Sequence, residues 1–248
     1  GNIAVGDEEV RRFMHFINGF NQLFDGNNNE VIRNKYTEIK EFLANKKEGD
    51  MDNRDILTIK GLIRRGEART SCTFNQIPLS RCHFLDLPFY ETGKIEKNPI
   101  SEADIEIVLK LLREVQPHQI YVAGDLADPH GTHRVCTDAV FAAVDAEKEN
   151  GAEWLKECRI WMYRGAWAEW EIENIEMAVP FSPEELREKR NSILKHQSQM
   201  ESAPFLGNDE RLFWQRSEDR NRGTASLYNQ LGLACYEAME AFVEYKPL

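Results

Sequence analysis

The chain has 248 residues, of which 42% are hydrophobic, so it can bury one large core and we expect a single domain over residues 1–248. Its formal net charge of −11 argues against a nucleic-acid-binding surface and against attraction to anionic lipid, which leaves small molecules or proteins as the expected partners. The five cysteines are scattered without a C-x-x-C pair, so they indicate neither a disulfide framework nor a structural zinc knuckle. Because no apolar run is long enough for a membrane helix and no signal peptide opens the chain, the expected location is the cytoplasm.

The first third of the chain is predicted to be helical. Apolar residues at helical spacing predict helices over residues 7–24, 29–46 and 52–70. Residues 82–89 are then predicted to form a buried strand. The next helix begins after Ser101, whose hydroxyl can cap it, and Pro117 prevents its continuation.

The centre of the chain has the pattern of a strand, a loop and a helix. Residues 120–122 are β-branched or aromatic and predict a strand, and residues 135–146 predict a helix. Residues 159–164 are the next predicted strand. Strands that alternate with helices predict an α/β fold of the Rossmann-like kind, with three layers and a mostly parallel sheet.

Two more helices are predicted near the end of the chain. Ser182, Pro183 and Glu185 mark a helix start with a capping box. Apolar residues that recur between Leu227 and Phe242 predict a final amphipathic helix.

Two histidines lie in the segment that follows the strand at residues 120–122. Ligands of open α/β sheets bind at the carboxyl edge of the parallel strands, where this segment is expected to place His130 and His133. At the start of a helix, side chains three residues apart point to nearly the same side. Imidazole can bind a metal or move a proton, but the same spacing also fits two solvated histidines, and spacing alone leaves both interpretations open.

Several tryptophans follow the strand at residues 159–164. Trp161, Trp167 and Trp170 lie close together in the sequence. Large aromatic side chains can stack on sugars, but they more often pack in or around a core, which is the role we favour. Both roles stay open on the sequence alone.

Four segments of the chain contain short sequence motifs that are considered together. They are Arg64–Ala68 (R-R-G-E-A), His83–Pro88 (H-F-L-D-L-P), Asp128–Arg134 (D-P-H-G-T-H-R) and Lys189–Gln199, which ends in H-Q-S-Q. Together they resemble motifs of the PIG-L/LmbE family of zinc-dependent N-deacetylases, which act on N-acetylglucosamine-type sugars. The resemblance covers essentially the whole chain. It is greatest to the deacetylase-like C-terminal half of bacterial fusion proteins whose N-terminal half is a glucosamine-6-phosphate deaminase/isomerase domain.

The resemblance implies a role for three residues. His133 matches a histidine that binds zinc, and His130 matches a histidine that assists catalysis by stabilising the oxyanion. Arg64 matches an arginine that contacts polar groups of the substrate. The substrate that the resemblance implies is an acylated amino sugar.

One motif of the family has no counterpart in the sequence. The family's first strand ends in A-H-P-D-D, which supplies a metal-binding histidine, a metal-binding aspartate and the catalytic base, but His-Pro-Asp occurs nowhere in this chain. The chain opens at Gly1 without methionine and without a strand, so we expect a cut end and missing N-terminal strands. Zinc is therefore expected in the complete family site and not in this chain.

Two functions stay open. The first is a zinc-dependent N-deacetylase-like domain of amino-sugar metabolism that is inactive as this chain alone. The second is a non-catalytic sensing or assembly domain of a glucosamine-6-phosphate deaminase/isomerase fusion protein. A sheet that lacks its first strands is expected to repack or to associate through its open edges, either with further copies of the chain or with the missing N-terminal part.

Overall fold

The computed structural model describes residues 8–24, 29–47, 50–90, 98–124, 131–165, 168–200, 211–232 and 235–246. Contacts group the chain into two compact units. Unit 1 comprises Gly1–Cys82 and Ser192–Pro204, and unit 2 comprises His83–Asn191 and Phe205–Leu248. A compact unit is not by itself an independent domain, so the single domain stays a prediction. None of the helices within the described ranges is long and apolar enough to cross a membrane.

Unit 1 is built from helices. Its elements are α1 (Glu8–Leu23), α2 (Asn29–Asn45), α3 (Arg54–Phe74) and the short 3₁₀ helices η1 (Leu79–Arg81) and η4 (Gln197–Gln199). The three predicted helices are confirmed, because their apolar residues do share a face: Phe20, Ile39, Ile56 and Ile59 form a buried cluster. Asn53 caps α3 by accepting a hydrogen bond from the backbone N–H of Ile56 at 3.0 Å.

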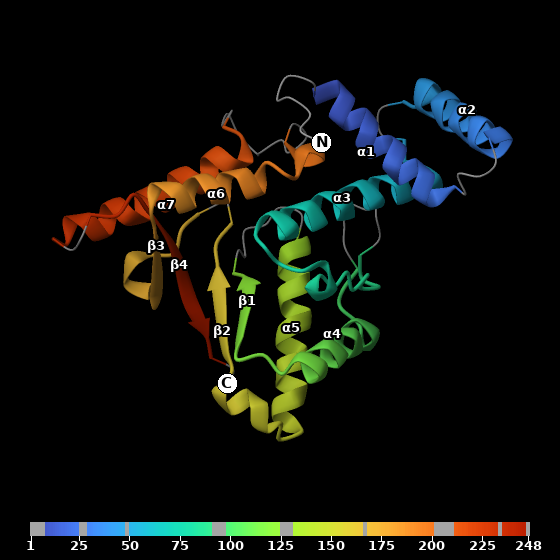
Figure 1. Ribbon diagram of the computed structural model, residues 1–248. Coiled ribbons are helices and arrows are strands. Elements are labelled where there is room, and N and C mark those ends of the chain that lie inside the picture. The colour runs from blue at the N-terminus through green and yellow to red at the C-terminus, as the bar shows by residue number, and fades with distance from the viewer. Residues whose placement is uncertain are drawn as a thin grey trace. The chain divides into compact units, whose positions relative to one another are not determined.

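Unit 2 contains the sheet. Its elements are α4 (Glu102–Val115), β1 (Gln119–Ala123), α5 (Thr132–Glu149), η2 (Glu153–Glu157), β2 (Arg159–Tyr163), η3 (Ile172–Asn174), β3 (Met177–Phe181), α6 (Pro183–Ile193), α7 (Phe213–Gln230) and β4 (Ala238–Tyr245) (Figure 1). The last two residues of α6 belong to unit 1. The strand order is β1-β2-β4-β3. The strands β1 and β2 are parallel, as predicted, whereas β4 is antiparallel to both of its neighbours. The α/β fold class is confirmed, and the sheet formed by the described residues is mixed.

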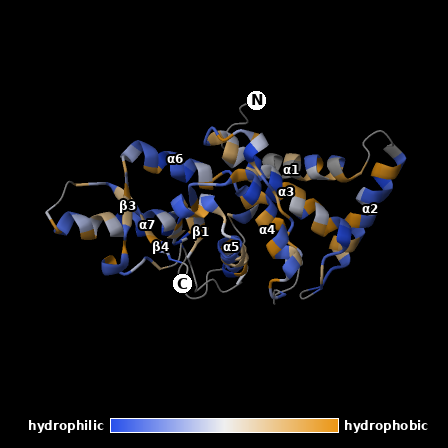
Figure 2. Ribbon diagram, turned by 90° about the horizontal axis from the view of Figure 1, so that it is seen from below, coloured by the Kyte–Doolittle hydropathy of each residue, from blue (hydrophilic) through white to orange (hydrophobic). Residues whose placement is uncertain are grey.

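Helices cover both faces of this sheet. Val122 of β1 and Ile160 of β2 are buried against α4 and α5, and α5 lies beside β1 in Figure 1. Glu240 lies in β4 on the opposite face, where it contacts side chains of α6 and α7. Three layers result, as predicted. The helices α6 and α7 are mostly hydrophilic in Figure 2, so polar contacts hold much of this second face.

The predicted strand at residues 82–89 is wrong. Residues 82–87 have no regular secondary structure, and residues 88–89 form a turn. Asp86 has a φ of 50°, a left-handed conformation that interrupts an extended strand. Leu85 and Leu87 nevertheless pack against the core under α4 and α5. The segment therefore buries its apolar side chains without pairing with another strand.

The predicted final helix is also wrong. The helix α7 ends before Gly232, whose φ of +76° is left-handed, and the chain then enters β4. Strand β3 was not predicted from the sequence. It contains Pro180, which a sheet accommodates at an edge, and β3 is an edge strand among those described.

A buried carboxylate fixes the start of α4. Asp104 is 0% exposed and accepts hydrogen bonds from the backbone N–H of Ser101 at 2.8 Å, the hydroxyl of Ser101 at 2.5 Å and the backbone N–H of Phe89 at 2.8 Å. Burial acts to raise the pKa of Asp104. The hydrogen bonds outweigh burial, with the Ser101 hydroxyl first, and the pKa lies below the ordinary 3.8. Asp104 therefore stabilises the fold as the anion.

Asp104→Asn should lower the free energy of unfolding at pH 7 by about 1–3 kcal/mol, because the amide loses the charge and one acceptor. The pKa of Asp104 is lowered on folding, so its contribution is fully present above 3.8 and is lost as the pH falls through the folded value. Urea unfolding at pH 7 and pH 3 should show the difference between variant and parent shrinking in acid. The exposed Asp138 provides the control, and Asp138→Asn should change stability by less than about 0.5 kcal/mol. Equal effects of the two substitutions at pH 7 would contradict the assignment.

Candidate functional site

His133 lies in the first turn of α5 and is exposed. The helix begins where β1 has just ended, and the hydroxyl of Thr137 donates a hydrogen bond to the backbone carbonyl of Ala123 at 2.7 Å. The start of α5 is thus held at the carboxyl end of β1, which is where the sequence placed His133. His130 lies outside the described residues. The roles assigned to both histidines, and their shared cleft, stay predictions.

An aromatic side chain packs tightly on this edge of the sheet. The backbone N–H of Gly124 donates to the carbonyl of Tyr163 at 2.8 Å, which continues the parallel pairing by one residue. The indole N–H of Trp170 donates to the carbonyl of Met162 at 3.2 Å, and its ring lies so near Gly124 that a Cβ there would be 2.6 Å from the ring. The guanidinium of Arg164 lies 3.9 Å from the centre of the same ring. Trp170 therefore packs the edge rather than standing free.

The second tryptophan of this region is part of the sheet. Trp161 is 5% exposed in the middle of β2. Of the two roles considered for the tryptophans, packing is the one that the structure shows for Trp161 and Trp170. Trp167 lies outside the described residues.

A cluster of charged side chains lies between the sheet and its second helical layer. We call it the charged cluster; its residues are Glu169, Lys189, Arg220 and Glu240. Glu240 accepts a hydrogen bond from Lys189 at 2.5 Å and forms an ion pair with Arg220. Arg220 also pairs with Glu169 at 2.7 Å. The side chain of Arg220 is only 5% exposed and those of the two carboxylates 13–18%, so every charge in the cluster is compensated by a neighbour.

Asn221 and Thr224 complete the hydrogen bonds of this cluster. Asn221 accepts from Lys189 at 2.6 Å and donates to the carbonyl of Met239 at 2.7 Å, while Thr224 donates to Glu169 at 2.7 Å. Burial acts to raise the pKa of Glu240, but the charges of Lys189 and Arg220 outweigh it and hold the pKa below its usual value. Glu240 is therefore an anion in the folded protein.

Tyr163 lies in β2 near Glu240 of the charged cluster. It ends β2, beside Gly124. Burial raises the pKa of Tyr163, and the charges of Glu240 and Cys136 add to the shift. The sequence did not reveal this arrangement. The one hint of the charged cluster in the sequence is Glu240, a charged residue among the apolar residues of β4. The apolar spacing of that segment predicted a helix, so the position of Glu240 in a sheet was not expected.

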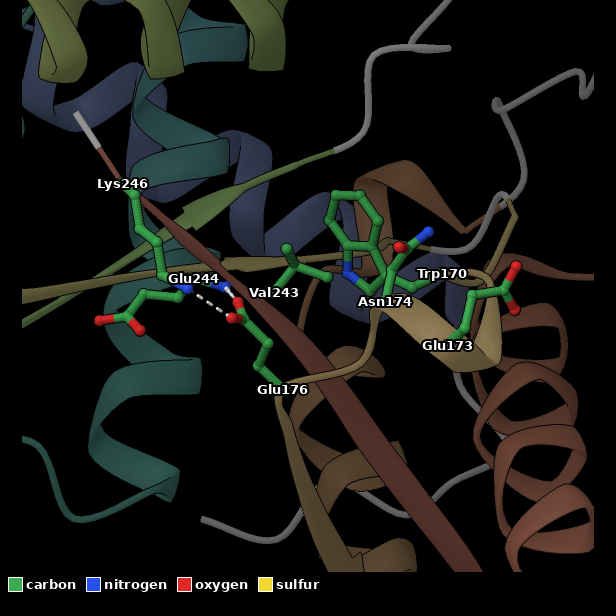
Figure 3. A pocket seen from close by; sticks show the side chains of 7 residues that line it. All are labelled: Trp170, Glu173, Asn174, Glu176, Val243, Glu244 and Lys246. Atoms are coloured by element: carbon green, nitrogen blue, oxygen red, sulfur yellow. Dashed lines mark hydrogen bonds and ion pairs between the residues drawn. The ribbon is translucent and has the colours of Figure 1, made fainter. Parts of the chain in front are cut away.

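A pocket of about 400 Å³ opens along η3 and β4 (Figure 3). Its lining residues are Trp170, Glu173, Asn174, Glu176, Val243, Glu244 and Lys246. Figure 3 shows the carboxylate of Glu176 directed toward the ammonium of Lys246 and the backbone N–H of Glu244, both at 2.7 Å. The hydrogen bond from Lys246 lowers the pKa of Glu176. Three carboxylates and one ammonium leave the lining with an excess of negative charge, which suits a neutral or cationic polar molecule.

Two of the four recognised segments meet inside unit 1. Glu67 on α3 is 1% exposed, and its carboxylate accepts hydrogen bonds from the backbone N–H and the hydroxyl of Ser198, each at 2.7 Å. These bonds join the R-R-G-E-A segment to the H-Q-S-Q segment. Arg64, the predicted substrate contact, is exposed one turn earlier on the same helix. Its role stays a prediction.

The described residues do not fit the zinc ion that the family resemblance implies. Within the described part of the chain, His, Cys, Asp and Glu side chains nowhere form a group of three or more that could hold a metal. A catalytic zinc takes three protein ligands and a water molecule. His133 can supply one of them, so no step of a reaction is assigned to a metal held by these residues.

Comparison with known proteins gives a longer relative and a similar fold. No family model matches the chain. All 248 residues align at 84% identity with a protein of Bacteroides thetaiotaomicron named glucosamine-6-phosphate deaminase-like protein, and the chain spans 37% of the length of that relative. The fold is similar to that of GalB, the 4-carboxy-2-hydroxymuconate hydratase of Pseudomonas putida, with a TM-score of 0.50, 12% identity, and coverage of 82% of this chain and 77% of that one. At 12% identity the likeness shows the fold alone.

Proposed function

We propose that this chain serves amino-sugar metabolism as the part of a longer protein that binds an N-acetylated amino sugar. The observation that carries the proposal is the position of His133, exposed in the first turn of α5 at the carboxyl end of a parallel strand. The relative that is 84% identical to the chain is named for a glucosamine-6-phosphate deaminase, and it is more than twice as long. The deacetylase chemistry of the PIG-L/LmbE family needs two more zinc ligands, which we place outside the described residues.

The runner-up is a sensing or assembly role without catalysis. Such a role needs neither the A-H-P-D-D motif nor a three-ligand group, and it is therefore compatible with the residues that the structure describes. Both proposals expect the chain alone to retain no zinc and to release no acetate. They differ in what the longer protein does.

The 248-residue chain should bind N-acetylglucosamine 6-phosphate in a calorimetric titration. His133→Ala should weaken this binding about tenfold, the scale of one hydrogen bond to the sugar. His118 is the matched control, because it is exposed at the opposite, amino end of β1. His118→Ala should leave the affinity unchanged. Equal affinities of the two variants, or no binding by the parent chain, would remove the basis of the proposal.

The longer protein separates the two roles. Elemental analysis and an acetate assay on it should detect zinc and turnover if the chain is part of a deacetylase, and His133→Ala should abolish both. Sugar binding without acetate release identifies the sensing role. Stoichiometric zinc in the 248-residue chain by itself would show that further ligands exist within it.

A further inference from the structure

The strand β1 lies at one edge of the sheet that the described residues form. Its one neighbour in that sheet is β2, which runs parallel to it. The other edge is β3, where Pro180 has no N–H to offer a further strand. The five residues of β1, Q-I-Y-V-A, include neither proline nor a charged side chain, the two features with which proteins keep an edge strand from pairing.

The hydrogen bonds at the two ends of β1 show which of its backbone groups face β2. The N–H of Arg159 donates to the carbonyl of His118 at 2.9 Å, and the N–H of Gly124 donates to the carbonyl of Tyr163 at 2.8 Å. In a parallel pair, every second residue of a strand directs both its N–H and its C=O toward the same neighbour. The even-numbered residues between His118 and Gly124 therefore bond to β2.

The odd-numbered residues of β1 face the open edge. They are Gln119, Tyr121 and Ala123. The carbonyl of Ala123 already accepts a hydrogen bond from the hydroxyl of Thr137 at 2.7 Å. The backbone N–H and C=O of Tyr121, in the middle of the strand, have no partner among the residues that the structure describes, and Tyr121 is 50% exposed. A strand laid along this edge is the structure that pairs such groups.

The core beside β1 can also accept a further strand. Val122 is buried under α4 and α5, but several apolar side chains packed around it are only partly buried: Leu85, Leu87, Ile100, Ile105 and Ile120. Successive side chains of a strand alternate between the two faces of a sheet, so an added strand would bring every second side chain to this layer. Those side chains would remove apolar surface from water.

We propose that the outer edge of β1 is a docking surface for a β-strand from the part of the longer protein that lies outside residues 1–248. The relative that is 84% identical to the chain has more than half of its length outside the matched part, which is ample for such a strand. A second copy of the chain is the other occupant that an open edge can take. A strand within the same protein has the advantage, because tethering raises its effective concentration at the edge. The inference rests on the proposal that the chain is part of a longer protein and is independent of the sugar.

The test is amide hydrogen exchange at single-residue resolution in the 248-residue chain and in the longer protein. The amides of Ile120 and Val122 should be slow in both, because they bond to β2. The amide of Tyr121 should exchange fast in the chain and slowly in the longer protein. A Tyr121 amide that stays fast in the longer protein would overturn the proposal, as would one already slow in the monomeric chain. Protection that grows with the concentration of the chain alone would show a second copy at the edge, which also overturns it.

A pair of variants tests the same edge through stability. Tyr121→Pro removes the outward N–H, whereas Tyr121→Ala keeps it, and both remove the ring that lies 5.5 Å from that of Phe242. In the 248-residue chain the two variants should melt at similar temperatures, because an edge strand accepts proline where its N–H faces solvent. In the longer protein Tyr121→Pro should melt well below Tyr121→Ala, since a carbonyl of the docked strand loses its donor. An equal gap between the variants in the two proteins would contradict the docking. These measurements involve no sugar, so their failure is distinct from a failure of the sugar titration.

Discussion

Glu240→Gln should lower the free energy of unfolding by about 3–5 kcal/mol, because it leaves Lys189 and Arg220 with an uncompensated buried charge. Glutamine retains the size and one acceptor of glutamate, so the loss measures charge more than packing. The loss should appear in urea unfolding of unit 2 monitored by tryptophan fluorescence, since Trp161 lies in β2 and Trp154 and Trp170 pack against residues of the sheet.

A surface ion pair serves as the control for this experiment. Glu153 pairs with Lys156 at 2.6 Å, and the two side chains are 80% and 70% exposed. Glu153→Gln should change stability by less than about 1 kcal/mol, because water screens that pair. Equal losses for the two glutamates would show that the charged cluster contributes no more than a surface pair.

Gly124→Ala is expected to destabilise unit 2 by about 1–3 kcal/mol, the cost of overpacking. The new Cβ would lie 2.6 Å from the ring of Trp170 and 2.8 Å from the Cβ of Met162. Trp170 cannot retreat without breaking its hydrogen bond to Met162 and its contact with Arg164. Thermal unfolding measures the loss, and a red-shifted Trp170 emission is expected if the ring is displaced.

Gly223 gives the matched glycine for comparison. It lies inside α7, and a Cβ added there would meet nothing within 4 Å, so Gly223→Ala should stabilise the helix by about 0.4–1 kcal/mol. The two substitutions add the same methyl group and should act in opposite directions. Stabilisation by Gly124→Ala would show that moving the Trp170 ring from its present position costs the fold no stability.

Local patterns were sufficient for the elements that carry the predicted site. The β-branched run of β1 and the apolar spacing of α5 fixed that strand and helix, and with them the position of His133. The pattern failed where one residue overrides it, as at Asp86, where a left-handed φ breaks an otherwise apolar strand pattern. It failed again after Gly232, where apolar residues four apart suited a helix as well as the strand that forms.

The charged cluster was beyond the reach of sequence patterns for a different reason. Its members come from four separate segments, with Glu169 and Glu240 71 positions apart. Periodicity describes neighbours along one helix or strand, and it cannot show which distant segments pack together. Each of these residues alone looks like an ordinary surface charge, so the pairing became visible only with the fold.

The hydrogen bonds from Ser198 to Glu67 also limit when unit 1 can fold during synthesis. The two residues are 131 positions apart, so at about 5–20 residues per second a ribosome needs about 7–26 s to add Ser198 after Glu67. During that interval the carboxylate of Glu67 lacks the two hydrogen bonds that Ser198 later donates to it. Unit 1 therefore cannot complete its hydrogen bonds in the order in which it is synthesised, because the whole first part of unit 2, His83–Asn191, is synthesised before Ser198.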